Sequence, residues 1–277
     1  MMFDYHIHPN YSCDAEGSID DFCQAAIAKG VREIAFTTHL DTDYKAEDCV
    51  VRVKEEMIDT HSGVWLEDYE NTIRTAAERY LDDDLVVLLG AELDIYPGVI
   101  EKLPKGFTDV EWDLIIGSVH LIDHQAISLK EDAEEIFSKH SVEELGETYF
   151  SIVLDTIETS MINILGHLDL YRRFGEDFYG PQIHELWKPH TDELANRMKK
   201  FNVGFEVNTS SWRKGQHEPL PSINFIKALV ERGVDTITVG SDAHSPNDVG
   251  ADIDRALALL GNCCGIKPSR FRGGTKL

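Results

Sequence analysis

The feature that most constrains the fold is a series of short apolar segments that alternate with amphipathic helical patterns. Seven segments have the composition of strands, at residues 3–7, 33–38, 85–89, 113–117, 161–165, 203–207 and 236–239. Helical periodicity or capping signals lie between them, over residues 18–30, 66–80, 141–152, 181–200, 221–232 and 248–260. This alternation predicts an α/β fold with a parallel sheet.

Two parts of the sequence do not fit this alternation. Residues 41–63 are polar, and we predict a loop with some helix there. The tail, residues 265–277, is glycine-rich and basic, and we predict that it is frayed and disordered. The sequence has no repeats, low-complexity segments or linkers, so residues 1–264 are predicted to form a single domain.

The composition argues against several classes of function. The 277 residues carry a formal net charge of −24, which repels nucleic acid and anionic membranes. No apolar run approaches the ~18 residues of a membrane helix, and no signal peptide is visible. The five cysteines follow no disulfide or zinc-finger spacing, which is typical of a reducing compartment. We expect a cytoplasmic protein without a nucleic-acid or membrane partner, and the sequence specifies no oligomeric state.

Side chains that can bind metals follow strand after strand. His6 and His8 lie on the same side of the first strand, because residues i and i+2 point the same way. Later strand ends and the loop after the first strand add Asp14, His39, Glu92, His120, His167, Asp242 and His244. Any one of them could be a core histidine, a cap or a surface acid. Their recurrence at strand ends favours a common role.

The positions of these residues favour a closed sheet. In a barrel of parallel strands the carboxyl ends share one face, where catalytic sites lie. The alternative, an open doubly wound sheet, would spread the strand ends along a line, and one site could not collect them all. Nine nitrogen and oxygen ligands also exceed the roughly four that one zinc ion takes. We therefore predict two to three divalent ions, of Zn, Mn or Fe.

The motifs around these residues occur in a fixed order between residues 3 and 251. They are His6-Ile-His8, Asp14, Thr-Thr-His39, Gly-Ala-Glu92, Gly-Ser-Val-His120, Gly-His167-Leu-Asp and Gly-Ser-Asp242-Ala-His244. This series resembles the polymerase and histidinol phosphatase (PHP) superfamily, and the stretch from Glu206 to Ser222 is similar to its histidinol-phosphatase branch. The resemblance implies a distorted (β/α)7 TIM-like barrel with a trinuclear site at the C-terminal mouth of the strands.

The resemblance also implies how the ligands are shared. The first ion would be held by His6, His8, Glu92 and Asp242. Glu92 would bridge to a second ion, held also by His120 and His167. The third ion would be held by Asp14, His39 and His244, and some relatives carry histidine at the position of Asp14.

Such a centre suits the hydrolysis of phosphate esters. Adjacent metal ions clamp a phosphate and lower the pKa of a bridging water toward ~7, and the resulting hydroxide attacks phosphorus. The sequence has neither a Gly-x-Ser-x-Gly nucleophile motif nor a P-loop. Charge on the phosphoryl oxygens also calls for cations. We predict that the substrate is bound by Arg172, Arg173, Asn208 and Arg213, and that the catalytic residues are Glu92, Asp242 and Arg213.

The predicted function is that of a metal-dependent phosphomonoesterase acting on a small phosphorylated substrate. The resemblance implies a histidinol-phosphatase, which converts L-histidinol phosphate to L-histidinol and phosphate in histidine biosynthesis. Another PHP phosphoesterase, acting on a nucleotide, a sugar phosphate or phosphotyrosine, is an alternative, as is a non-catalytic metal-binding domain. An amidohydrolase is less consistent with the sequence, because it would typically carry a lysine at the end of a mid-barrel strand.

Overall fold

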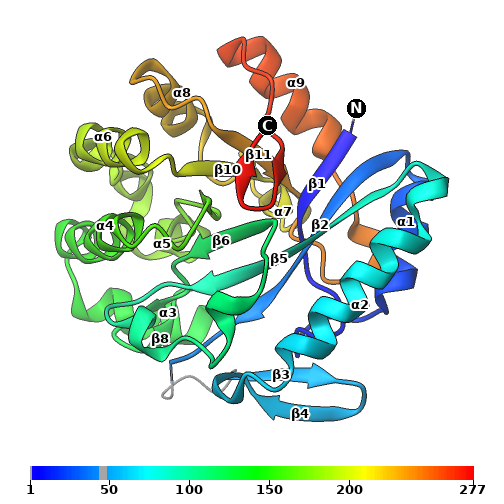
Figure 1. Cartoon of the computed structure of the whole chain (residues 1–277). Coiled ribbons are helices and arrows are strands. Elements are labelled where there is room, and N and C mark those ends of the chain that lie inside the picture. Colours follow the sequence, from blue (N-terminus) through cyan, green and yellow to red (C-terminus); the bar gives the residue numbers. More distant parts are fainter. Residues whose placement is uncertain (1, 44–48) are drawn as a thin grey trace.

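The centre of the molecule is a seven-stranded sheet in which every adjacent pair of strands is parallel. A computed structural model describes residues 2–43 and 49–277 (Figure 1). In spatial order the strands are β1 (Met2–Ile7), β2 (Val31–Leu40), β5 (Val86–Asp94), β6 (Leu114–Ser118), β9 (Ile164–Leu165), β10 (Gly204–Asn208) and β11 (Ile237–Gly240). This spatial order is also the order in the sequence, as in a βα barrel.

The sheet closes on itself at one end. The edge strands β1 and β11 meet through Ala243, three residues beyond β11. The Ala243 carbonyl accepts the His8 N–H at 2.8 Å, and its own N–H donates to the His6 carbonyl at 3.3 Å. This bridge lies at the carboxyl ends of both strands, so the barrel is nearly closed at its mouth. The predicted distorted (β/α)7 barrel is confirmed, and the open sheet is excluded.

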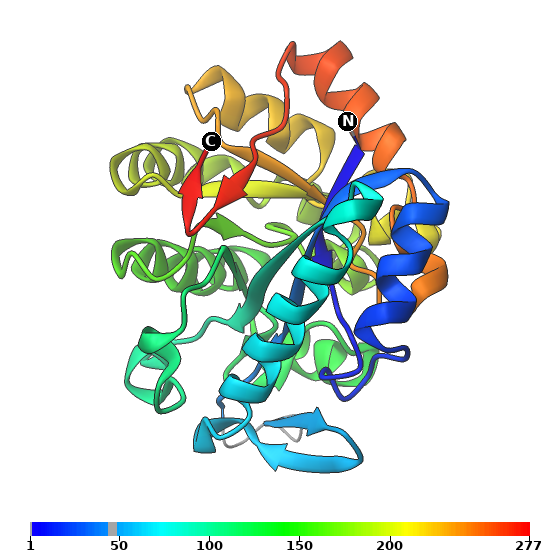
Figure 2. The ribbon, with the colours of Figure 1, turned by 45° about the vertical axis from the view of Figure 1, so that its right-hand side comes forward.

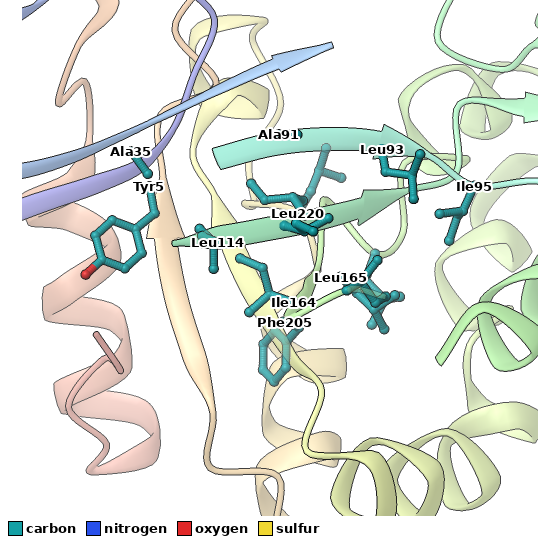
Figure 3. Close-up of a cluster of buried hydrophobic side chains, with 14 of the residues drawn as sticks. Tyr5, Ala35, Ala91, Leu93, Ile95, Leu114, Ile164, Leu165, Phe205 and Leu220 are labelled. Carbon is teal, nitrogen blue, oxygen red and sulfur yellow. The ribbon is translucent and has the colours of Figure 1, made fainter. Parts of the chain in front are cut away.

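Helices surround the sheet (Figure 1) and bury the apolar cluster shown in Figure 3, which includes Ile164 and Phe205. They are α1 (Ile19–Ala28), α2 (Leu66–Arg79), α3 (Lys130–Lys139), α4 (Val142–Glu158), α5 (Arg172–Tyr179), α6 (Thr191–Phe201), α7 (Ser210–Arg213), α8 (Ile223–Glu231) and α9 (Ile253–Cys264). The single helix predicted over 181–200 is wrong: two 3-10 turns precede α6, and Pro189 in the second has no N–H for a helical bond. Across residues 2–43 and 49–277, none of the helices has the length and apolarity to cross a membrane.

A hairpin projects from the barrel between β2 and α2. It consists of β3 (Val50–Val53) and β4 (Glu56–Asp59), and it stands apart from the barrel in both views (Figures 1 and 2). The prediction of a loop with some helix is therefore wrong for residues 50–59, and residues 44–48 lie outside the described part. Three valines in β3 favour a strand, and Lys54, at φ 57°, supplies the left-handed turn.

The C-terminal tail packs against the barrel, so the prediction that it is disordered is wrong. Its strands β12 (Phe271–Arg272) and β13 (Thr275–Lys276) form a hairpin, and the Phe271 side chain is buried. The cause is a buried acid in β2. Glu33 is 0% exposed, and it accepts hydrogen bonds from the Tyr5 hydroxyl and from the Arg270 guanidinium, whose Nε lies 3.1 Å from Oε2. Arg270 thereby fixes the tail at the amino ends of the strands.

We expect Arg270→Ala to destabilise the fold by about 3 kcal/mol, because it leaves the charge of the fully buried Glu33 uncompensated. Urea unfolding of the two proteins measures this difference. Lys276→Ala is the matched control, since it breaks a solvent-exposed ion pair with Asp235 and should cost ~0–1 kcal/mol. Equal effects of the two substitutions would contradict the role of Arg270.

Candidate metal centre

The strand register brings the predicted metal-binding residues to the mouth of the barrel. His39 in β2 pairs with Glu92 in β5, and Glu92 pairs with Ile116 in β6. All nine predicted side chains lie together at this end: His6, His8, Asp14, His39, Glu92, His120, His167, Asp242 and His244. The structure thus agrees with the predicted clustering, and the role of these residues as ligands stays a prediction.

The Glu92 carboxylate lies at the centre of the cluster. Its side chain is 1% exposed, and the Ser118 hydroxyl donates to Oε1 at 2.6 Å. Imidazole nitrogens lie 3.0–3.6 Å from its two oxygens, and they belong to His6, His8, His39, His120 and His167. A carboxylate buried this deeply is stable only when positive charge or hydrogen-bond donors surround it.

The neighbouring histidines determine the protonation of Glu92. Burial alone raises the pKa of a carboxyl group, but the nearby His6 and His120 imidazoles hold the pKa of Glu92 well below its usual range. The group is therefore ionised. For His8, burial lowers the pKa instead of raising it. Together with the positive charge of His39 and His244, burial holds the pKa of His8 well below its ordinary value. An ionised carboxylate and a neutral imidazole are the forms that bind metal ions.

The nine side chains form three groups, which we call the first, second and third group after the ions predicted for them. Glu92 belongs to both the first and the second group. The first group is His6, His8, Glu92 and Asp242; the second is Glu92, His120 and His167; the third is Asp14, His39 and His244. In the second group, His167 Nε2 lies 3.0 Å from Glu92 Oε1 and 3.2 Å from His120 Nε2, and His120 Nε2 lies 3.6 Å from Glu92 Oε1. In the third group, His244 Nε2 lies 3.2 Å from Asp14 Oδ2 and 3.4 Å from His39 Nε2, and His39 Nε2 lies 3.7 Å from Asp14 Oδ2.

The first group is slightly wider. The Nε2 atoms of His6 and His8 lie 3.2 and 3.5 Å from the Glu92 oxygens, and 4.0 and 3.4 Å from Asp242 Oδ1. Atoms bound to one tetrahedral zinc ion at about 2.0–2.2 Å are about 3.3–3.6 Å apart. Each group therefore has the dimensions of a metal site.

Several buried polar atoms in these groups have no hydrogen-bond partner within the described residues. They are His6 Nε2, His8 Nε2, His39 Nδ1, Glu92 Oε2 and His167 Nδ1. Leaving such atoms unpaired costs free energy, so their grouping calls for a ligand that accepts lone pairs from nitrogen and oxygen. A set of imidazoles and carboxylates without cysteine fits Zn, Mn or Fe. The residues present thus fit the predicted metal ions.

A second layer of residues orients these side chains. Glu206, fully buried in β10, contacts His6 Nδ1 at 2.9 Å and accepts the His167 backbone N–H at 2.9 Å. This contact turns His6 Nε2 toward Glu92, as carboxylates commonly do for histidine ligands. A side chain at Gly240 would place its Cβ 2.4 Å from the Cβ of His6, which explains the glycine there. Glu206 was not predicted to have a role, although an acid inside a buried strand was a signal.

The structure corrects the role predicted for Asn208. Its side chain is fully buried, and its amide donates to Glu206 Oε1 at 2.9 Å and to Asp242 Oδ2 at 3.4 Å. The amide oxygen accepts from Ser210 Oγ at 2.7 Å. Both ends of the amide are therefore occupied, and Asn208 orients two carboxylates rather than contacting a substrate.

Two of the three arginines predicted to bind substrate are used elsewhere. The buried Arg172 pairs with Asp169 at 2.6 Å and donates to the Pro219 carbonyl, so its predicted role is wrong. Arg213 donates to the carbonyls of Ser241 and Asp242, at 2.7 and 3.2 Å. Asp242 has a left-handed backbone, at φ 56°, so Arg213 supports the strained turn that presents its carboxylate.

A cavity of about 300 Å³ opens onto the three groups. Arg173, the third predicted arginine, lines it together with Lys214, and Arg213 does not. Burial and the neighbouring Arg173 guanidinium lower the pKa of Lys214. The positive charges of Arg173 and Lys214 repel each other across the cavity. An anionic ligand bound between them would relieve this repulsion.

We expect Glu92→Gln to reduce the metal content by at least one ion per chain, and kcat/KM by about 10²-fold or more, because an amide cannot balance the charge of two ions. Elemental analysis and assays of the same preparations measure both effects. Glu101→Gln, which neutralises an exposed acid, is the control. Full metal content and native turnover in Glu92→Gln would contradict the bridging role.

The fold and the nine clustered side chains define a barrel whose mouth has side-chain groups that fit metal ions. The family model described as PHP domain matches residues 4–210. The chain therefore belongs to the PHP domain family, and the resemblance recognised in the sequence is confirmed.

Relatives with assigned names match almost the whole chain. A protein of Deinococcus radiodurans named "Probable histidinol-phosphatase" is 29% identical over 90% of this chain and 88% of its own length. The "Histidinol-phosphatase" of Lactococcus lactis is 26% identical, over 93% of this chain and 89% of its own. The crystal structure of histidinol phosphate phosphatase from L. lactis, complexed with Zn, L-histidinol and phosphate, superposes with a TM-score of 0.77 and 22% identity. It covers 100% of this chain and 98% of its own.

Proposed function

We propose that this protein is a metal-dependent phosphomonoesterase that hydrolyses L-histidinol phosphate to L-histidinol and phosphate. The observation that carries this proposal is the set of three metal-sized groups around Glu92, beside a cavity that presents Arg173 and Lys214. Ions with this ligand set polarise phosphoryl oxygens and lower the pKa of bound water toward about 7. The names of the relatives that match along nearly the whole chain support the same reaction.

The residues of the chain divide the work on the substrate. Arg173 and Lys214 would bind the phosphoryl oxygens that do not face the metal groups, and would stabilise the charge that develops on them. Glu92 and Asp242 would bind the metal ions. Glu206 keeps the His6 ring fixed, and Arg213 keeps the turn at Asp242 fixed. This division requires no serine or cysteine nucleophile.

The remaining lining of the cavity suits a cationic organic group. Asp41 and Asp94 lie in the lining, and both acids favour an ester that carries a positive charge. Leu121, Leu129 and Leu170 add apolar surface of the kind on which an aromatic ring packs. Histidinol phosphate combines an amino group with an imidazole ring, whereas sugar phosphates have neither.

We further propose that the enzyme uses two to three ions of Zn, Mn or Fe, and that it acts in the cytoplasm on a small substrate. The three groups of side chains described above support the number of ions. The five cysteines follow no disulfide spacing in the sequence, which supports a reducing compartment. The net charge of −24 disfavours a polyanionic substrate such as nucleic acid.

A panel of phosphate esters tests the proposed substrate. We expect kcat/KM for L-histidinol phosphate to exceed that for nucleotides, sugar phosphates and phosphotyrosine by about 10²-fold or more, since none of the other esters combines an ammonium group with a free imidazole ring. Chelation should abolish turnover, and added Zn or Mn should restore it. A higher kcat/KM for another ester would assign a different phosphoesterase activity, and a metal-free active preparation would contradict the proposal altogether.

Arg173→Ala and Lys214→Ala should each lower kcat/KM about 10²–10³-fold, because each removes a donor to the phosphoryl group. Metal content should stay at the wild-type value, since neither residue belongs to the metal groups. Lys200→Ala, on the exposed face of α6, is the control. Inhibition by inorganic phosphate should weaken in parallel with the loss of activity. If phosphate inhibits these variants as well as the wild type, the two cations do not bind the phosphoryl group.

A further inference from the structure

The third group differs from the other two in how its carboxylate is held. Asp14 lies outside the strands, on the loop of residues 9–17, which we name the Asp14 loop. Its side chain is 53% exposed, whereas His244 and His39 in the same group are 31% and 17% exposed. Packing therefore does little to fix Asp14, and its position depends on the backbone of the loop.

That backbone is hydrogen-bonded to the other members of the third group. The Glu16 N–H donates to the His244 carbonyl at 2.9 Å, and the His39 N–H donates to Ser12 Oγ at 3.0 Å. The Asp14 loop thus joins the segments that carry His39 and His244. A shift of this loop would change the third group directly, whereas its contact with the first group is the longer one from Ser12 Oγ to His8 Nδ1, at 3.4 Å.

One side chain from outside the barrel gathers the carbonyls of this loop. Arg52, in strand β3 of the projecting hairpin, donates from Nη2 to the Cys13 carbonyl at 2.6 Å. Its Nη1 donates to the carbonyls of Ala15 and Asn10, at 3.1 and 3.3 Å. These three carbonyls flank Asp14 on both sides, so a single guanidinium sets the curvature of the loop around it.

The backbone of the hairpin reinforces this contact. The Arg52 N–H donates to the Tyr11 carbonyl at 2.8 Å, and Val51 forms an antiparallel bridge with Ser12. The hairpin stands outside the barrel (Figures 1 and 2), and this is where it reaches the metal-binding end of the chain. The contact gives a function to an insertion that contributes no strand to the barrel.

We propose that Arg52 is a positioning residue for the third metal ion: through the Asp14 loop it sets the affinity of the group formed by Asp14, His39 and His244. The proposal rests on the metal-dependent function proposed above. Arginine suits this role because its planar guanidinium has five donors in a fixed geometry. Lysine, with one compact ammonium group, cannot reach three carbonyls in the same way.

The test is titration of Zn or Mn into the full-length protein after chelation, followed by calorimetry and elemental analysis. For Arg52→Ala we expect the weakest binding step to weaken about 10–100-fold, as for other losses of groups that orient metal ligands. The tighter steps should be unchanged. Arg52→Lys should restore the weakest step only in part. Excess Mn should return the kcat of Arg52→Ala toward the wild-type value, whereas a merely damaged fold would not recover.

Two further variants make the result specific. Arg79→Ala is the matched control, because Arg79 lies near Arg52 in the same polar groove but pairs with Asp20 instead of the loop. It should bind metal like the wild type. Asp14→Asn should weaken the same step as Arg52→Ala, and the double variant should lose little more than either single one, because both act on one group.

Three results would overturn the proposal. Arg52→Ala could bind every ion as tightly as the wild type, it could weaken all binding steps equally, or it could weaken a step that Asp14→Asn leaves intact. Because the titration contains no substrate, its outcome is separate from that of the phosphatase assay. A wild-type protein that binds the ions but hydrolyses no phosphate ester would refute the proposed function and leave the role of Arg52 standing.

Discussion

The interaction on which the rest of the site depends is the burial of one carboxylate, Glu92, among five imidazole rings. A buried charge is tolerated only when its surroundings compensate it, so the elements that carry these rings must all reach one point. Strand β5, which carries Glu92, lies between β2 and β6. Histidines from β1, β2 and the segments after β6 and β9 can meet there because the parallel sheet curves almost into a closed barrel.

The sequence predicted the part of this arrangement that depends only on residues close together in the chain. A buried strand is an apolar run, and the residue after it lies at a strand end whatever the rest of the chain does. The sequence alone therefore places His39, His120 and His167 at one face. Strand lengths were less predictable. Strand β9 has only two residues, and just before it the side-chain oxygen of Asn163 accepts the Ile115 N–H.

The sequence did not predict features that depend on a distant partner. A basic residue after a strand can face the cavity or an acid, and only the fold decides: Arg173 lines the cavity, whereas Arg172 pairs with Asp169. The tail shows the same dependence over a longer separation. Glu33 in an apolar strand required a cation, but nothing local indicated that Arg270, 237 residues away, supplies it. The hairpin that carries Arg52 was likewise not predicted. The partners of Arg52 are backbone carbonyls, and a backbone carbonyl gives no signal in the amino-acid sequence.

The charge distribution explains how so acidic a chain can act on an anion. With the proposed ions in place, the carboxylates of Asp14, Glu92 and Asp242 offset only part of the metal charge, and Arg173 and Lys214 add to what remains. The mouth is then locally positive although the chain carries −24. Screening limits the repulsion from the outer surface to about 8 Å at physiological ionic strength. A small phosphate ester that fits the cavity of about 300 Å³ contacts mainly the positive mouth. A polymer of phosphates would also extend beyond the cavity, where the net charge of −24 repels additional phosphates. Under the proposed function, the acidic net charge would therefore favour small phosphate esters over large polyanionic substrates.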